Sequence, residues 1–389
     1  MIVRGTWTQE DRAESIYRYL PFEVPSGCPA VSVRLDYERT GGVIDLGVFD
    51  PAAFRGWTGS ARAGFVITST DATPGYLPGE IAAGEWRVML GLRRIPPEGI
   101  EYLVEVRLEE SSPEPMPPAP PPAPRPPRRR LPASAGRSWV AGDLHSHTVH
   151  SDGVLTVPQL ANLARASGLD FAAVTDHNTV SHHPHLAEAG GRYGVRLIPG
   201  QEVTTDDGHA NCLGDAEWVD FRGTADDWLR AVELAGGLMS INHPLVPDMG
   251  WRKELRQPTP LVEAWHWTWD QRSEEPWDWW PRHGGIPVGG SDFHSPAADR
   301  LGSPTTWVEV EGGDVLGALR AGRVALSAEP RGPLLLRHDE ELVAIDAEGT
   351  VLEGPGLREP ICGDRVTMAV GKGLCRLRDG RGRVVALVP

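Results

Sequence analysis

Histidines and carboxylates gather in the middle of the chain at spacings that suit metal binding. Of the 13 histidines, 12 lie between His145 and His294. The segment DLHSHTVHSDG begins at Asp143 and contains an HxH motif, and the segment GGSDFH ends at His294 with a DxH motif. In a strand, residues i and i+2 point to one face, so each motif can aim two side chains at one ion. Mixed imidazole and carboxylate ligands favour zinc, manganese or iron over calcium or magnesium.

The elements that must position these residues read as an α/β fold. Strand-like runs and helix-like stretches alternate from Trp139 to about Glu329, which indicates a parallel sheet and, we expect, a barrel. The active site of a parallel barrel lies at the carboxyl ends of its strands. The side chains in or just after the last residues of these runs are His145, His147, Asp152, Asp176, His177, Glu202, His243, Glu263, Asp292 and His294, and His209 opens the run after Glu202.

This set is too large for one metal ion. About nine of the side chains are suited to metal binding, whereas a single ion takes about four to six ligands. Two or three divalent ions that share a bridging carboxylate are therefore expected. Polar N-caps and glycine stops predict three helices nearby. They are 157–167 after Thr156 and before Gly168, a helix from Thr224 to near Gly236, and one from Asp314 to Gly322.

The flanking regions read as β structure. Residues 1–110 contain short apolar alternations between Gly/Pro turns and predict a β-sandwich. Residues 111–137 hold 11 prolines and predict an extended linker. The Arg128–Arg130 run within it is expected either to be a solvated end of the linker or to grip a surface carboxylate. Residues 138–330 would form the α/β domain, and residues 331–389 a small β-rich region.

Composition narrows the function classes. The formal net charge of −15 argues against strong nucleic-acid binding and against an anionic membrane surface. No apolar run approaches a membrane span, and the first residues lack a signal-peptide pattern. The four cysteines form no CxxC pair, so neither a disulfide framework nor a cysteine zinc site is expected. A cytoplasmic location is expected.

The order of the motifs resembles a known family. The segments DLHSHTVHSDG, TDHNTV, PGQEVTTDDGHANCLG, GGLMSINHP, VEAW, GGSDFH and LRAGRVALS are similar to those of PHP (polymerase and histidinol phosphatase) domains, and more narrowly to the CehA/McbA-like branch of these metallohydrolases. The resemblance covers roughly residues 139–330. It implies a distorted (β/α)7 barrel and a trinuclear metal site.

The resemblance also implies which side chains hold each ion. The first metal position would use His145, His147, Glu202 and Asp292. The second would use Glu202 as a bridge, with His209 and His243. The third would use Asp152, His177 and His294.

The expected reaction is hydrolysis of a phosphomonoester or phosphodiester by metal-activated hydroxide. No GxSxG motif offers a serine nucleophile. The catalytic residues are predicted to be Asp176, His177 and Arg300. Asp176 or a histidine not assigned to a metal would protonate the leaving group, and Arg300 would hold an anionic small-molecule substrate. The alternative is hydrolysis of a carboxylic or carbamate ester by the same metals. A third hypothesis, a binding protein with a vestigial site, conflicts with the complete ligand set.

Several residues near the motifs stay open between two roles. Asp176 and Glu263 could brace neighbouring ligands. The group of Trp265, Trp267 and Trp269 would share one strand face, either as core or as an aromatic wall beside the metals. The remaining candidates are expected at the pocket wall or the surface, and they are His150, His182, His183, His185, Arg252 and Arg282.

Overall fold

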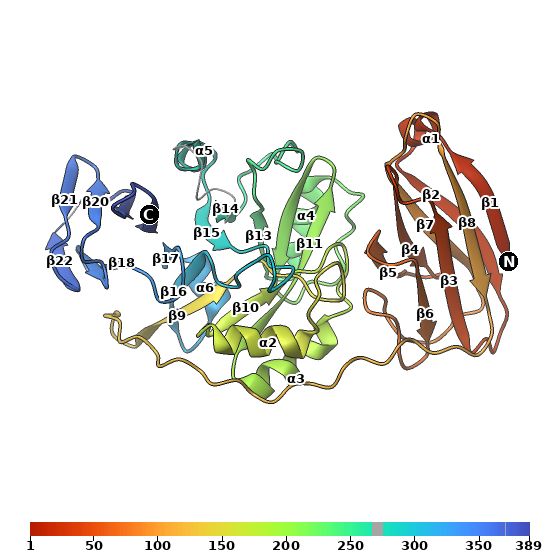
Figure 1. Cartoon of the computed structure of the whole chain (residues 1–389), viewed down its shortest axis with the longest axis horizontal. Helices are drawn as coiled ribbons and strands as arrows, with labels where there is room; N and C mark the ends of the chain where they lie inside the picture. Colours follow the sequence, from red (N-terminus) through yellow and green to blue (C-terminus); the bar gives the residue numbers. More distant parts are fainter. Residues whose placement is uncertain (267–274, 370) are drawn as a thin grey trace. The chain divides into compact units, whose positions relative to one another are not determined.

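A computed structural model describes residues 1–266, 275–369 and 371–389, with the backbone alone at 275–278 (Figure 1). The contacts within the chain define two compact units. Unit 1 contains Met1–Pro118, Thr148–Thr156 and Asp176–Pro184, and unit 2 contains Ala119–His147, Val157–Thr175 and His185–Pro389. Two loops from the middle of the chain thus belong with the N-terminal region. The domain boundaries expected at residues 110, 137 and 330 stay predictions.

The N-terminal region of unit 1 is built from two antiparallel sheets. In order across each sheet, the first contains β1 (Ile2–Trp7), β8 (Ile100–Arg107), β3 (Ala30–Tyr37) and β6 (Gly64–Thr68), and the second contains β2 (Tyr17–Val24), β7 (Gly84–Arg94), β4 (Val43–Phe49) and β5 (Phe54–Gly59). Both sheets contribute to one core, with Val33 and Val104 from the first and Val48 and Val88 from the second. This is the arrangement expected of a β-sandwich.

Unit 1 also contains a short helix that the hydrophobic pattern did not predict. This helix, α1 (Gln9–Glu14), has no buried residue, so it lacks the apolar periodicity that marks longer helices. Its start is fixed by a capping box between Thr8 and Asp11.

Unit 2 is organised around a mixed sheet. In the described part of the chain this sheet has 13 strands, in the order β15-β14-β13-β12-β11-β10-β9-β16-β17-β24-β23-β20-β21. The strands from the middle of the chain are β9 (Arg137–Asp143), β10 (Phe171–Val174), β11 (Arg196–Thr205), β12 (Gly208–Leu213), β13 (Leu238–Ile241), β14 (Leu261–His266), β15 (Ile286–Gly290), β16 (Thr305–Glu311) and β17 (Val324–Ser327).

The expected parallel sheet is present in part, because β9, β10 and β11 are parallel to one another, as are β13, β14 and β15. Strand β12 is antiparallel to both β11 and β13, and β16 is antiparallel to β9. The reason is local: β11 and β12 pair from Thr205 to Gly208 across two residues, and so short a connection can join only antiparallel strands. Among the described strands, the sheet does not close into a barrel. Strands β9 and β15 do not pair with each other, and their extensions are joined by an isolated bridge between Ser146 and Phe293.

The three predicted helices are present. They are α2 (Val157–Ala166), α4 (Ala225–Leu234) and α6 (Val315–Arg320), and Thr224 and Asp314 cap the last two as expected. Two further helices, α3 (His183–Tyr193) and α5 (Glu275–His283), were not predicted. Helix α3 contains two glycines, which disfavour a helix, and it is stabilised instead by burial of Leu186, Ala189 and Tyr193. Among the described helices, none is long and apolar enough to cross a membrane.

The proline-rich segment is attached to unit 2 from Ala119 onward. Arg125 and Arg128 both pair with Asp170, at 2.6 and 2.7 Å, and Arg129 pairs with Asp346 at 2.6 Å. Within the arginine run, Arg128 and Arg129 therefore pair with carboxylates, as one of the two expected roles has it, and the side chain of Arg128 is also 73% exposed.

The C-terminal region is β-rich, as expected, and continues the main sheet of unit 2. Strand β24 pairs with β17 through Leu326 and Leu387. The C-terminal strands are β18 (Leu334–His338), β19 (Glu341–Ile345), β20 (Val351–Gly354), β21 (Leu357–Pro360), β22 (Arg365–Ala369), β23 (Cys375–Arg378) and β24 (Val384–Val388). Among them β18, β19 and β22 form a separate three-stranded sheet.

Candidate metal centre

The HxH and DxH motifs lie side by side in unit 2. The parallel bridge pairs Ser146 with Phe293, the middle residues of the two motifs. The backbone N–H of His147 donates to the carbonyl of Phe293 at 2.8 Å. Because the flanking residues of bridged strands share a face, both motifs present their functional side chains to the same side. As a result, Oδ1 of Asp292 lies 3.1 Å from Nε2 of His145 and 3.0 Å from Nε2 of His147.

Glu202 lies at the middle of a second group of histidines. It belongs to β11, whose hairpin partner β12 carries His209, and His243 follows β13. Oε1 of Glu202 lies 3.2 Å from Nε2 of His145, 3.2 Å from Nδ1 of His209 and 3.4 Å from Nε2 of His243. Its other oxygen, Oε2, is 3.6 Å from Nε2 of His147. One carboxylate therefore touches the histidines of both predicted positions.

Neighbouring polar groups hold these side chains in place. Oε1 of Glu263 lies 3.1 Å from Nδ1 of His145, which leaves Nε2 to face the centre, and Oε2 accepts from the backbone N–H of His243 at 2.6 Å. The bracing role suggested for Glu263 agrees with this geometry. A β-carbon on Gly290 would lie 2.1 Å from Oε1 of Glu263. Glycine is therefore required where the sheet approaches this carboxylate.

Backbone strain marks two of the candidate ligands. His243 has φ = 26° and Asp292 has φ = 49°. Positive φ is uncommon for residues other than glycine and costs about 1–3 kcal/mol, and it tends to occur at functional sites.

The charges of the centre depend on one another. Burial by itself lowers the pKa of His145, but the carboxylates of Asp292, Glu202 and Glu263 outweigh burial and raise that pKa well above its usual value. For Asp292, burial raises the pKa, and the neighbouring His145 and His147 bring it well below the usual range. The carboxylates thus require compensating positive charge, which protons on the histidines or metal cations can provide.

The donor set fits divalent metal ions. Ligand atoms of His145, His147 and Asp292 lie within 4.8 Å of one another, as do those of His145, Glu202 and His243. Nε2 of His145 is buried and makes no well-aligned hydrogen bond among the described residues, although two carboxylate oxygens lie near it. Such an atom, aimed at carboxylates rather than bonded to them, is expected where a cation sits between the two.

The predicted ligands of the third metal are divided between the units. Asp152 and His177 belong to the two loops of unit 1, and Oδ1 of Asp152 lies 3.5 Å from Nε2 of His177. His294 belongs to unit 2, where its ring stacks on that of His147 with centroids 4.2 Å apart. The grouping of these three residues stays a prediction.

Asp176 is buried and its carboxylate links the two loops of unit 1. Its carboxylate accepts from the N–H and hydroxyl of Thr148 at 2.8 and 2.7 Å and from the hydroxyl of Ser151 at 2.7 Å. Nδ1 of His182 lies 3.2 Å from it. This geometry favours a bracing role for Asp176. Its role as a proton donor stays a prediction.

The other candidates have varied surroundings. Trp265 is buried in a core cluster, which confirms core packing for this residue, while Trp267 and Trp269 lie outside the described residues. His150 and His182 are buried. Among the candidates, Arg252, Arg282 and Arg300 are exposed, and a substrate role for Arg300 stays a prediction.

Three residues of the centre were missed by sequence reasoning. Asp143 accepts from the backbone N–H groups of His145, Ser291 and Gly302, at 3.1, 3.0 and 2.6 Å, and so links the two motif segments. Asn242 donates to Oε1 of Glu202 at 2.8 Å. Nε2 of His266 lies 3.6 Å from Oδ2 of Asp292. Asp143 and Asn242 lie within quoted motifs and His266 directly follows one, and each adjoins or ends a strand, which is the signal that could have identified it.

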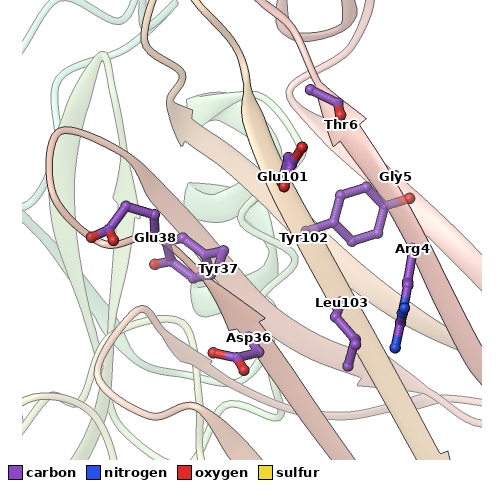
Figure 2. Close-up of a pocket in the computed structure, with 9 residues that line it drawn as sticks. All are labelled: Arg4, Gly5, Thr6, Asp36, Tyr37, Glu38, Glu101, Tyr102 and Leu103. Carbon is purple, nitrogen blue, oxygen red and sulfur yellow. The ribbon is translucent and has the colours of Figure 1, made fainter.

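A pocket of about 730 Å³ lies elsewhere, on the sandwich (Figure 2). It is lined by Arg4, Gly5, Thr6, Asp36, Tyr37, Glu38, Glu101, Tyr102 and Leu103. These residues come from β1, β8 and β3 and the residue after β3, and they include no histidine. The pocket therefore differs in chemistry from the histidine centre.

In a comparison with known protein families, residues 143–264 match the model of the PHP domain. A 5'-3' exoribonuclease of Haemophilus influenzae is 38% identical over 64 residues, which are 16% of this chain and 23% of that protein. The 5'-3' exoribonuclease Rnm of Salmonella typhimurium is 43% identical over 65 residues, 16% of this chain and 22% of that protein. The chain thus spans less than a quarter of the length of these two relatives.

Among solved structures, a two-domain protein of Bacteroides vulgatus, described as containing a predicted PHP-like metal-dependent phosphoesterase, has a TM-score of 0.44 and 18% identity. The similarity covers 68% of this chain and 91% of that one.

Proposed function

We propose that the chain, whose residues 143–264 match the family model of the PHP domain, is a metal-dependent hydrolase of phosphoesters. The CehA/McbA-like branch and a distorted (β/α)7 barrel are part of the proposal. So is the trinuclear site, with zinc, manganese or iron as the metal. The cytoplasmic location stays a prediction.

The observation that carries the proposal is the position of Glu202. One buried carboxylate oxygen lies within 3.4 Å of imidazole nitrogens from His145, His209 and His243. A carboxylate shared among several imidazoles is the arrangement that a bridging ligand between two divalent ions requires. The proposed ligands are His145, His147, Glu202 and Asp292 for the first ion, Glu202, His209 and His243 for the second, and Asp152, His177 and His294 for the third.

Divalent ions held by these residues would activate a water molecule near neutral pH and neutralise charge on the substrate oxygens. The chain's own residues prepare the site for this chemistry. Glu263 fixes the ring of His145 through Nδ1, and Asn242 fixes one oxygen of Glu202. Because both ligands are fully buried, bulk water is kept from their donor atoms and electrostatic interactions within the site are strong.

Proton transfer and substrate binding are proposed for residues nearer to solvent. His177, whose side chain is 20% exposed, is proposed as a metal ligand within reach of the leaving group and of water, and a histidine that holds no ion is proposed as the proton donor. Arg300 is exposed six residues after His294 and would bind the anionic group of the substrate. Asp176 is proposed to position His177 through its bonds to Thr148 and Ser151.

A substrate panel tests the proposal. Purified protein loaded with Mn²⁺ or Zn²⁺ is assayed with aryl phosphate monoesters and diesters, aryl carbamates and aryl acetates. Because two relatives are named as 5'-3' exoribonucleases, single-stranded RNA with a 5'-phosphate is included. We expect turnover of at least one phosphoester. Turnover of carbonyl esters alone would show that the chain is a carbonyl ester hydrolase instead. An absence of turnover, together with less than one metal ion per chain, would favour a vestigial site.

A further inference from the structure

The loops that carry Asp152 and His177 are built into the same compact unit as the β-sandwich. We propose that the sandwich is a positioning module for these loops, with Gly75, Thr179 and Ser181 as its positioning residues. This inference rests on the proposed function, because Asp152 and His177 matter here as metal ligands. It assigns the N-terminal region a role in building the site.

The contact is centred on the backbone of Gly75, in the connection between β6 and β7. The N–H of Gly75 donates to the hydroxyl of Ser181 at 3.0 Å, and the hydroxyl of Thr179 donates to the carbonyl of Gly75 at 3.0 Å. Both hydroxyl residues are buried. A buried backbone group that loses its partner costs about 1–3 kcal/mol, so this pair of bonds fixes the sandwich against loop 176–184.

The close approach requires glycine at position 75. Its φ is +102°, a conformation that residues with a side chain rarely adopt. A β-carbon there would lie 2.4 Å from Cγ2 of Thr58 and 2.9 Å from the carbonyl oxygen of His150. Gly75 therefore packs directly against loop 148–156 as well. Arg62 of the sandwich makes a second contact with that loop by donating to the carbonyl of Val149.

A continuous set of hydrogen bonds leads from Gly75 toward the candidate ligands. The hydroxyl of Ser181 lies 2.8 Å from the ring atom Nδ1 of His150, and the backbone N–H of His150 donates to the hydroxyl of Thr148 at 3.1 Å. Thr148 in turn donates to Asp176, the residue before His177.

Ser151, the residue before Asp152, donates to the same carboxylate. The network thus joins both loops next to each candidate ligand. We infer that the sandwich sets the separation of Asp152 and His177, which is 3.5 Å between Oδ1 and Nε2.

The test removes the contact without touching a ligand. Ser181→Ala deletes the acceptor for Gly75 and leaves the backbone unstrained, while Thr179→Val deletes the second bond and Thr179→Ser retains it. Gly75→Ala adds the clash. Gly41→Ala is the matched control, because Gly41 also has a positive φ, of +84°, but nothing lies within 4 Å of its β-carbon. Three quantities are measured on the full chain loaded with Mn²⁺: metal per chain, amide exchange of residues 148–156 and 176–184, and kcat and KM.

We expect Ser181→Ala, Thr179→Val and Gly75→Ala to weaken binding of one ion per chain by about tenfold, which is the lower end of the range for lost outer-sphere contacts. Amide exchange in both loops should become faster, and kcat should fall more than KM rises. Thr179→Ser and Gly41→Ala should resemble the wild type in metal content and loop exchange.

Unchanged metal affinity and loop exchange in Ser181→Ala and Gly75→Ala would overturn the positioning role. The same would follow if Gly41→Ala caused an equal loss, because the effect would then be general instability. A wild-type chain that binds no metal would instead contradict the proposed function itself, so the two failures are distinguishable.

Discussion

The two sets of candidate ligands are held in different ways. In unit 2, His145 and Glu202 lie within or directly after strands, and their side chains are 0% exposed. In unit 1, Asp152 and His177 lie on loops, and their side chains are 46% and 20% exposed. The first set is aligned by sheet register, through the Ser146–Phe293 bridge and the β11–β12 hairpin. The second set is aligned by hydrogen bonds between the loops and the sandwich.

The difference indicates how the two sets should respond to damage. A buried carboxylate beside buried imidazoles is expensive to leave uncompensated, so the unit 2 centre should bind cations tightly and lose much when one ligand is removed. A half-exposed pair is hydrated and contributes less. We therefore expect the unit 2 centre to keep its metal ions tightly and the loop pair to bind its ion more weakly.

The largest effect is expected from Glu202→Gln. This change removes the charge of the proposed bridging carboxylate, and loss of several kcal/mol of stabilisation of the transition state corresponds to a fall in kcat/KM on the order of 10³-fold or more. Steady-state kinetics with Mn²⁺ on the active phosphoester measures it. Glu309→Gln is the control. Glu309 lies on strand β16 and is also buried, but its carboxylate accepts from the backbone N–H of Ser134. Full activity in Glu202→Gln would show that Glu202 is not a bridge.

A smaller loss is expected from Glu263→Gln. The amide keeps the size of the side chain but weakens the hold on Nδ1 of His145 and on the N–H of His243. Such outer contacts are worth about 10–100-fold in metal affinity or activity. Competition with a chelator measures the Kd for Mn²⁺. A Kd equal to that of the wild type would mean that the backbone alone orients His145.

Asp152→Asn tests whether the two sets are independent. Because Asp152 is about half exposed, its contribution is expected to be about 1 kcal/mol, which lowers kcat/KM by up to roughly tenfold. Metal analysis should show the loss of at most one ion per chain. Loss of all bound metal would show that the loop pair and the unit 2 centre form one cooperative site and would remove the distinction between them.

Thr224→Ala should have the smallest effect on the site. It removes the capping box that Thr224 forms with Asp227 at the start of α4. The free energy of unfolding should fall by about 1 kcal/mol, as measured by urea denaturation, with metal content and kcat/KM unchanged. Loss of metal in this variant would mean that site integrity follows general stability rather than the contacts described above.

The sequence predicted the pairing of side chains within each motif better than it predicted the sheet. Histidines and carboxylates at i and i+2 lead directly to the paired motifs, because side-chain alternation is a local property of extended backbone. Capped helices such as α4 and α6 were likewise predicted from Thr224 and Asp314. The direction of β12 was not predicted, since apolar runs indicate burial and do not indicate which neighbour a strand pairs with.

The attachments made over long sequence separations could not be predicted. Gly75 is 106 residues from Ser181, and nothing in the local pattern of either residue indicates the other. The same holds for Arg128 and Asp170 in unit 2. Such contacts depend on the whole fold, so the role of the sandwich could be inferred only from the structure.

The most direct test of the account is the number of metal ions bound per chain by wild-type protein dialysed against Mn²⁺ and then against metal-free buffer. Element analysis of the wild type and of Glu202→Gln should be done side by side. The wild type should hold at least two tightly bound ions, and the variant should lose at least one of them. Less than one ion per wild-type chain would contradict the claim that His145, Glu202 and Asp292 form a metal centre.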